Sequence, residues 1–288
     1  MDNTKNTIKL GHFCSTENGL GAAASQAHDS GSTTLMVYTG EPQSYYKRPI
    51  RELRIEIGQI MMREYGLTDL VVHAGFLINP ASPDQDKQLK AIELLKEEIE
   101  RAEAVGSKLL VLHPGSYTTS TRDEGISNCI KVLNHTFKEL GSTPVTVCLE
   151  TMAGKGHEIG RSLEELRNIL EGVHETYRNN VAVCLDTCHL NDAGYDLTDT
   201  TAFLNEVKKT VSLDKVKVLH INDSKNPRGS HKDRHANIDR GTIGLAPIKA
   251  IVNHPAFMDI PKILETPNNL FREEIELLTN TTTKSSGT

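Results

Sequence analysis

The 288-residue sequence lacks the features that mark membrane-spanning, secreted and disulfide-linked proteins. Its uninterrupted apolar runs are four to six residues long, far short of the ~20 residues needed to cross a bilayer, so we expect no membrane association. The N-terminal residues MDNTKNTIKL contain no apolar segment typical of a signal peptide, which predicts an intracellular protein that is not secreted. Five cysteines, an odd number, are scattered along the chain and indicate reduced thiols rather than a disulfide framework.

Aromatic residues and positive charge are also scarce. Trp is absent and aromatic residues make up only 5% of the sequence, so extensive base-stacking surfaces are not expected. The 38 acidic residues outnumber the 32 basic ones and give a formal net charge of −6, which disfavours binding to nucleic acid by bulk charge. Any affinity for phosphate must therefore come from a local site.

Short β-branched runs alternate with amphipathic segments along the whole sequence. The runs that we predict to be strands cover residues 8–13, 33–38, 70–74, 109–113, 145–150, 181–186, 216–222 and 262–265. The segments with helical character cover residues 20–30, 48–65, 84–107, 123–140, 161–178, 198–212, 245–253 and 268–279. This alternation predicts an α/β protein, a TIM (β/α)₈ barrel in a single domain spanning residues 1–280, with a doubly wound open sheet as the alternative. The polar residues 281–288 are expected to form a disordered tail.

Residues able to bind metal fall at the predicted strand ends. One stands at or near the end of each of six consecutive strands, at separations of 40, 37, 36, 34 and 45 residues: His73, His113, Glu150, Asp186, His220 and Glu265. The carboxyl ends of the strands form the active-site face of a barrel, so these six side chains should converge on one pocket. The following loops add His189 and, in a D-R-H tripeptide, Asp233 and His235.

The chemistry of these nine residues points to a cluster of ions. Imidazole and carboxylate ligands without thiolate suit Zn²⁺, Mn²⁺ or Fe²⁺ in an open catalytic site, and nine ligands are enough for two or three ions. Four carboxylates contribute −4 and three dications would contribute +6, so with about −1 for a bridging hydroxide the pocket is cationic by about one charge. Such a pocket favours an anionic substrate, and a phosphodiester fits it.

Seven short motifs, which follow one another along the chain, resemble those of a known protein family. They are HAGFLIN (73–79), HPGS (113–116), LETMAGKG (149–156), CLDTCHLNDAGYD (184–196), HINDSK (220–225), GSHKDRH (229–235) followed by GTIG (241–244), and LETP (264–267). With these motifs the sequence resembles the endonuclease IV family, which are zinc-dependent apurinic/apyrimidinic endonucleases in the superfamily of xylose-isomerase-like TIM barrels. The resemblance runs continuously over about residues 70–267 and more weakly from residue 10.

The resemblance implies three zinc ions per chain, for which Mn²⁺ could substitute, and assigns the nine ligands to them. His73, His113 and Glu150 hold the first ion, and Glu150 bridges it to a second held by Asp186, His220 and Glu265, while His189, Asp233 and His235 hold the third. It further implies a DNA-repair hydrolase that acts as a monomer on double-stranded DNA containing abasic sites. The family cleaves the phosphodiester 5′ to the abasic site and leaves a 3′-hydroxyl and a 5′-deoxyribose phosphate, and Glu150 is the catalytic ligand that positions the attacking hydroxide.

The resemblance also implies DNA contacts, and here the sequence departs from the usual pattern. Phe13 in GHFCSTENGL stands where the family usually has His, and Gln43 in PQSYY stands where it commonly has Arg, with Tyr45 as the nearby aromatic residue. Phe76 and Leu77 replace a frequent Tyr-Leu pair and still supply an apolar wedge for the gap left by a missing base. In the metal-site loop, Lys225 and Arg234 are candidates for phosphate contacts, with solvent-exposed solubilising charge as the alternative.

Two other functions remain open from the sequence. A single-metal sugar or sugar-phosphate isomerase or epimerase of the same barrel superfamily would use carboxylates and His at the same strand ends, but it has no use for His189 or the D-R-H tripeptide. A catalytically silent DNA-binding module would bind lesions without needing the metal ligands.

Other residues have structural interpretations. We interpret the charge run KEEIER (96–101) as a solvated helix face and Ser162 with Glu165 as a capping box. Cys148 and Cys184 are interpreted as small fillers of the barrel core, while Cys188 stays undecided.

Overall fold

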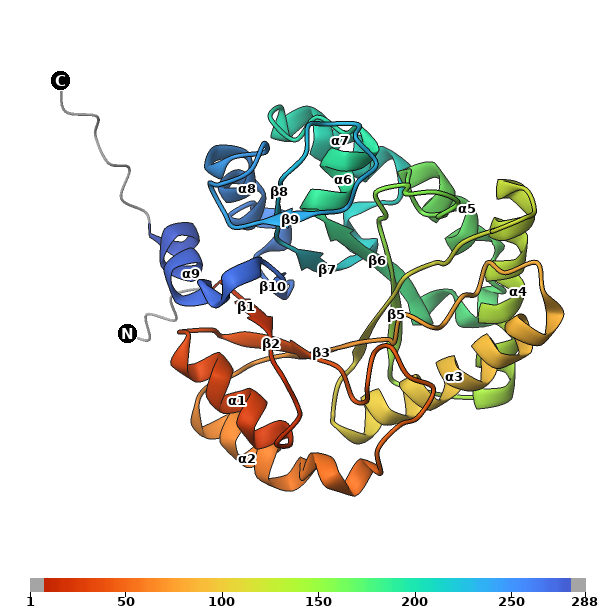
Figure 1. The fold of residues 1–288 in the computed structure, drawn as a ribbon, viewed down its shortest axis with the longest axis horizontal. Coiled ribbons are helices and arrows are strands. Elements are labelled where there is room, and N and C mark those ends of the chain that lie inside the picture. Colours follow the sequence, from red (N-terminus) through yellow and green to blue (C-terminus); the bar gives the residue numbers. More distant parts are fainter. Residues whose placement is uncertain (1–7, 281–288) are drawn as a thin grey trace.

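Eight parallel strands close into a barrel in a computed structural model that describes residues 8–280. Around the barrel the strands follow the order β1-β10-β7-β6-β5-β4-β3-β2, so each strand lies beside its neighbours in sequence (Figure 1). The barrel strands are β1 Leu10–Phe13, β2 Thr34–Val37, β3 Leu70–His73, β4 Leu109–Leu112, β5 Thr146–Glu150, β6 Val181–Asp186, β7 Val216–His220 and β10 Lys262–Leu264. The predicted TIM barrel is confirmed, and the open-sheet alternative is wrong because β1 pairs with β10 and closes the sheet.

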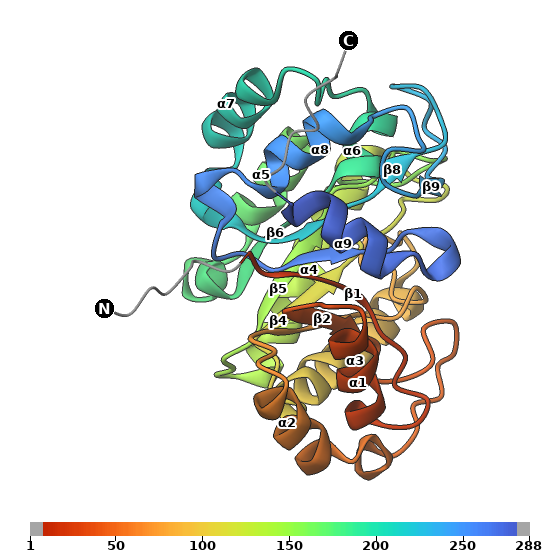
Figure 2. The same ribbon diagram turned by 90° about the vertical axis from the view of Figure 1, so that its left-hand side faces the viewer.

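The helices surround this barrel as an outer layer (Figures 1 and 2). They are α1 Leu20–Asp29, α2 Ile55–Glu64, α3 Gln85–Ala104, α4 Arg122–Leu140, α5 Leu163–Gly172, α6 Thr187–Ala193, α7 Thr200–Thr210, α8 Leu245–Val252 and α9 Phe271–Thr279. Short 3₁₀ helices span Ile50–Leu53, Glu175–Asn180, Leu213–Lys215, Pro255–Phe257 and Pro267–Asn269. A two-stranded antiparallel hairpin, β8 Asp223–Ser224 and β9 His235–Ala236, lies beside α6 at one edge of the barrel in Figure 2.

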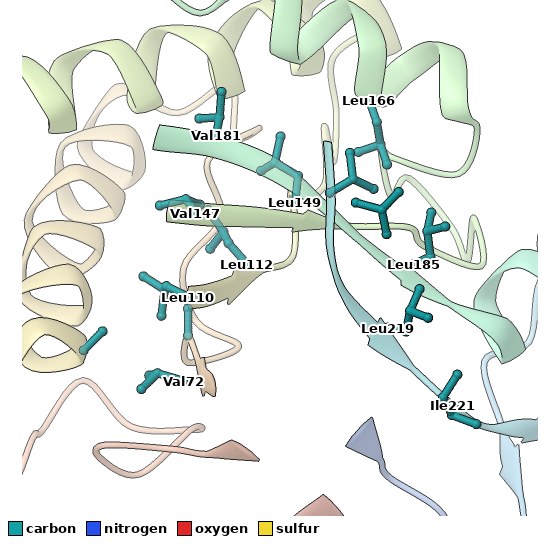
Figure 3. Packing of buried hydrophobic residues seen from close by; sticks show 14 of the residues in the cluster. Val72, Leu110, Leu112, Val147, Leu149, Leu166, Val181, Leu185, Leu219 and Ile221 are labelled. Carbon is teal, nitrogen blue, oxygen red and sulfur yellow. The ribbon is translucent and has the colours of Figure 1, made fainter. Parts of the chain in front are cut away.

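The two faces of the barrel strands pack against different layers, as the period of two along a strand requires. Outward side chains such as Leu110, Leu149 and Leu185 pack with the helices, and Leu166 of α5 lies among them in Figure 3. Inward side chains form a separate core inside the barrel, and most are small or β-branched: Met36, Val71, Val111, Cys148, Ala182, Cys184, Val218 and Ile263. The prediction that Cys148 and Cys184 fill the barrel core is confirmed.

The boundaries differ from the predicted ones in a few places. The expected helix over 48–65 is divided at Arg54, whose φ of 50° is left-handed, and the expected helix over 161–178 ends at Gly172 before a 3₁₀ turn. The capping box at Ser162 is incomplete: Ser162 Oγ accepts from the Glu165 amide at 3.2 Å, but the Glu165 carboxylate accepts from the amide of Gly160 at 2.7 Å instead. The predicted tail at 281–288 lies outside the described residues, and within residues 8–280 no helix is long and apolar enough to cross a membrane.

Candidate metal centre

The six residues predicted at strand ends share the inward face of the barrel. His73 lies two residues after the inward Val71, and the same spacing relates Glu150 to Cys148 and His220 to Val218. His113 and Glu265 directly follow the last residues of β4 and β10, two residues after the inward Val111 and Ile263. Because all six continue the inward positions at the carboxyl end of a parallel barrel, they meet at one mouth.

Glu150 lies at the centre of the cluster and faces two groups at once. Its Oε2 is 3.3 Å from His73 Nε2 and 3.1 Å from His113 Nε2. Its Oε1 is 3.0 Å from His220 Nδ1 and 3.2 Å from His189 Nδ1. The two oxygens of one buried carboxylate thus face different sets of imidazoles, which is the geometry of a bridging ligand.

A second group forms around His220. Its Nδ1 lies 3.1 Å from Glu265 Oε2 and 3.9 Å from Asp186 Oδ2, in addition to its approach to Glu150. All four residues offer ligand atoms within 4.8 Å of one another, as do His73, His113 and Glu150.

The third group lies on the two segments that follow β6 and β8. Asp186 accepts the His189 amide through Oδ1 at 2.7 Å and so caps α6, a short helix that the sequence analysis missed and that places His189 one turn beyond the strand. His189 Nε2 is 3.1 Å from Asp233 Oδ1, and His235 Nε2 is 3.7 Å from the same oxygen. The structure therefore brings all nine predicted residues together, in the three groups that the resemblance implies. Their role as metal ligands stays a prediction.

The spacing of some nitrogen and oxygen atoms in the cluster suits metal binding better than hydrogen bonding. Within residues 8–280, the buried Nε2 atom of His235 has no hydrogen-bond partner, although it faces the cluster. His235 Nε2 is 3.7 Å from Asp233 Oδ1 and 3.9 Å from Asp186 Oδ2, too far for hydrogen bonds but suited to ligands that each lie ~2 Å from a shared ion. Buried polar atoms are rarely left without a partner, so this spacing favours a cation between His235, Asp233 and Asp186.

Backbone carbonyls orient the other ring nitrogen of three imidazoles. His73 Nδ1 is 2.8 Å from the Ala74 carbonyl, His189 Nδ1 is 2.8 Å from the Thr151 carbonyl, and His235 Nδ1 is 3.2 Å from the Glu265 carbonyl. A donating Nδ1–H leaves Nε2 as the lone-pair nitrogen, which is the form that binds a metal.

The electrostatics of the cluster favour cations. Burial works to raise the pKa of Glu150, but His220 and His113 hold it well below its usual range. Burial likewise opposes ionisation of Glu265, yet His220 lowers its pKa to about 2. Burial works against a charged His189, but Asp186 and Asp233 raise its pKa well above the ordinary value. Asp186 behaves differently, since burial raises its pKa. Protons and metal ions compete for the same imidazole nitrogens, so the field that attracts protons also attracts metal ions.

Several polar residues that position the candidate ligands were not identified from the sequence. Asn222 is fully buried, donates to Asp186 Oδ2 at 2.7 Å and to Glu265 Oε2 at 3.3 Å, and accepts the Glu265 amide at 2.9 Å. Asp192 of α6 accepts the Asp233 amide at 2.9 Å and so ties the D-R-H segment to the helix. A signal was available for Asn222, because it lies two residues after His220 and continues the same face.

The residues predicted to contact DNA are exposed around this mouth. Phe76 is 47% exposed and Tyr45 is 59% exposed, and Leu77, Gln43, Lys225 and Arg234 are also exposed. Phe13 is half-buried at the end of β1, where its ring packs against Tyr38 at a centroid distance of 5.0 Å. Tyr38 in turn lies 5.3 Å from the His73 ring, so β1 and β2 contribute aromatic side chains to the mouth. Cys188 is buried, and its thiol lies in a further group of ligand-type atoms with Asp186 and His235.

Comparisons with known proteins agree with this geometry. The family model of the xylose isomerase-like TIM barrel matches residues 24–281. A protein named probable endonuclease 4 from Staphylococcus aureus (strain Newman) is 47% identical over 250 residues, which cover 86% of this chain and 83% of the relative. The chain belongs to the endonuclease IV family.

Solved structures place this endonuclease IV family member within a wider fold group. The crystal structure of endonuclease IV from Thermus thermophilus matches with a TM-score of 0.79 at 27% identity, covering 93% of this chain and 99% of that one. A D-tagatose 3-epimerase-like protein matches with a TM-score of 0.67 at 18% identity, covering 93% of this chain and 94% of that one, which shows a shared fold only.

Proposed function

We propose that this chain is an apurinic/apyrimidinic endonuclease that hydrolyses the DNA phosphodiester 5′ to an abasic site and leaves a 3′-hydroxyl and a 5′-deoxyribose phosphate. The observation that carries the proposal is the convergence of nine imidazole and carboxylate side chains, in three groups, at one mouth of the barrel. Membership of the endonuclease IV family supports it.

The residues would divide the work among three zinc ions. His73, His113 and Glu150 would hold one, Glu150 with Asp186, His220 and Glu265 a second, and His189, Asp233 and His235 a third. When bound, zinc ions polarise a phosphate oxygen and lower the pKa of water towards neutrality. Glu150 would fix the spacing of two ions because its two oxygens face different groups. The buried carboxylate of Asp186 and the partly exposed carboxylate of Glu265 would be held in place by Asn222, which donates to both.

The sugar isomerase or epimerase alternative would use only part of this site. One group, made of Glu150, Asp186, His220 and Glu265, is sufficient for a single-metal enzyme. The additional groups at His73–His113 and at His189–Asp233–His235 would then have no purpose, although they contain five of the nine residues. The number of zinc ions per purified chain separates the two functions: about three supports the nuclease, and about one supports the isomerase.

The direct test uses a duplex with one tetrahydrofuran lesion, incubated with the zinc-loaded protein with and without chelator. We expect a single cut 5′ to the lesion, a 3′-hydroxyl end, and loss of cutting in chelator. Glu150→Gln and Asp233→Asn should each reduce the rate by at least about 10³-fold, because each removes a charge that a metal needs.

The matched control is Asp214→Asn, the same chemical change on a carboxylate just before β7, at the opposite end of the barrel from the metal centre. It should cut at the parental rate. An uncut lesion strand under zinc-replete conditions would refute the proposed function, and so would a Glu150→Gln protein as active as its parent.

A further inference from the structure

Two charged residues are buried in the long helix α3, where the sequence predicted a solvated face. Glu98 is 1% exposed and Arg101 is 8% exposed, so the interpretation of the run 96–101 as a solvated face is wrong for these two residues. Burying a carboxylate costs several kcal/mol unless it is paired and hydrogen-bonded, so the contacts of Glu98 need an explanation.

Those contacts come from the two loops that carry the exposed aromatic side chains. We define the β2 loop as residues 38–49 and the β3 loop as residues 74–79. Glu98 Oε1 accepts from Lys47 Nζ in the β2 loop and from the Gly75 amide in the β3 loop, the latter at 3.1 Å. Glu98 Oε2 accepts from Thr39 Oγ1 in the β2 loop at 3.2 Å. One carboxylate therefore joins both loops to the same helix.

The Lys47 side chain reaches Glu98 through a buried space between the two loops. That side chain is only 6% exposed. A Cβ atom added at Gly40 would lie 2.5 Å from Lys47 Cδ, and one added at Gly75 would lie 3.4 Å from Lys47 Nζ. The stem of Lys47 therefore passes through space that a side chain at position 40 would occupy, while position 75 leaves only van der Waals room beside the ammonium group.

Further hydrogen bonds connect the β2 loop to the β3 loop, to α3 and to the segment after β1. The Phe76 amide donates to the Pro42 carbonyl at 2.8 Å, which joins the tips of the two loops directly. Arg101 donates to the carbonyl and the hydroxyl of Thr39, and Arg48 donates to Thr16 in the segment after β1. The exposed rings of Tyr45 and Phe76 stand on a framework whose centre is the Lys47–Glu98 pair.

We propose that the buried Lys47–Glu98 ion pair is a positioning device that sets the spacing of the β2 and β3 loops and thereby the selectivity for lesion DNA. The inference rests on the proposed function. A buried ion pair contributes little net stability compared with an apolar pair of the same size, but its directional contacts allow fewer arrangements. Because three donors from two loops converge on one carboxylate, a change there should alter the relative positions of Tyr45 and Phe76 before it unfolds the barrel.

Glu98→Gln separates this idea from simple electrostatics. The substitution removes one negative charge near the mouth, so charge alone predicts tighter binding to any duplex. Positioning predicts the opposite for lesion DNA: kcat/KM for a tetrahydrofuran duplex should fall about tenfold, mainly through KM, while the inhibition constant of an intact competitor duplex stays the same or decreases. Zinc content and the hydrolysis of bis(p-nitrophenyl) phosphate should not change, because that diester has no DNA strands for the loops to contact.

Two further variants complete the experiment. In Lys47→Met/Glu98→Gln both charges are absent, so no unpaired buried charge remains from the pair; it should melt close to the parent yet keep the reduced kcat/KM for the lesion duplex. Lys96→Met is the matched control. Lys96 lies on α3 like Glu98, but its partner is Glu139 of α4 at the surface, so the substitution should leave every measurement at the parental value.

Hydrogen exchange provides a readout that needs no DNA. The amides of the β2 and β3 loops should exchange faster in Glu98→Gln than in the parent and in Lys96→Met. A folded Glu98→Gln protein with parental kcat/KM and parental exchange overturns the inference, and so does an equal loss of bis(p-nitrophenyl) phosphate hydrolysis. If the parent itself leaves lesion DNA intact, the proposed function fails, and exchange in the two loops still decides whether the pair positions them.

Discussion

Asp223 provides the sharpest test of how the loops of this barrel are stabilised. It is fully buried in β8, and its carboxylate accepts from four backbone amides. Oδ1 accepts from Ser224 at 2.8 Å and Ile243 at 2.9 Å, and Oδ2 accepts from Gly241 at 3.1 Å and Gly244 at 3.3 Å. One side chain thus organises the turn over residues 241–244.

Asp223→Asn replaces one of the two oxygens with an amide nitrogen that cannot accept. Whichever way the new side chain turns, two backbone amides lose their partner and face another donor. A buried donor left without a partner costs about 1–3 kcal/mol, and the lower cost of burying a neutral group offsets part of the sum. We therefore expect the free energy of unfolding to fall by about 3 kcal/mol, which for a chain of this size lowers Tm by about 5 °C.

The assay is urea unfolding followed by circular dichroism, at one fixed zinc concentration because bound metal stabilises the native state. Asp239→Asn, the same change on an exposed residue of the same segment, should unfold like the parent. Gly241→Ala should also destabilise strongly, because its Cβ would collide with Asp223 Oδ1 and with the Ser224 carbonyl oxygen. An Asp223→Asn protein within about 0.5 kcal/mol of the parent would show that these four contacts do not stabilise the turn.

Two other predictions concern the opposite ends of the barrel. Burial lowers the pKa of Lys262 from its ordinary value to about 8, so between pH 8 and about 10.5 the unfolded chain binds more protons and the free energy of unfolding should rise with pH. Urea titrations at pH 7.5 and pH 10 should show that this free energy rises by up to about 3 kcal/mol more in the parent than in Lys262→Met. The same pH dependence in both proteins would contradict the shift. At the mouth with the candidate metal ligands, Phe76→Ala should lower kcat/KM for the lesion duplex about tenfold, because a base-stacking contact is worth about 1–3 kcal/mol. Hydrolysis of bis(p-nitrophenyl) phosphate should stay unchanged, and equal losses on both substrates would show that Phe76 supports the site rather than contacting DNA.

The barrel and the convergence of the six strand-end candidates could be predicted because both depend on periodicity, whereas the division of the nine residues into three groups was implied only by the family resemblance. A period of two along each strand assigns one face inward, and Cys148 and Glu150 or Val218 and His220 show that face directly in the sequence. The parallel arrangement then places the carboxyl ends of all strands at one mouth, which is why residues about 36 positions apart meet.

Helix α6 and the burial of Glu98 in α3 could not be predicted in the same way. The seven residues after β6, TCHLNDA, are too few to show an amphipathic period, and the helix begins where the Asp186 side chain caps it. Glu98 lies among Lys96, Glu97 and Glu100, so its burial depends on a lysine 51 residues away that no local pattern reveals.

Three carboxylates that the sequence did not reveal share a physical role, which is the support of irregular backbone in the loops. Glu98 receives the Gly75 amide, Asp192 the Asp233 amide, and Asp223 four amides of its own turn and of residues 241–244. The backbone amides of a loop have no neighbouring strand to accept their hydrogen bonds, so a buried carboxylate accepts them instead. Each of the three lies in a different part of the sequence from most of its donors, and none has a repeating pattern. Six of the nine candidate ligands can therefore be predicted from strand periodicity, whereas the carboxylates that hold the loops become visible only when the donors are seen in space.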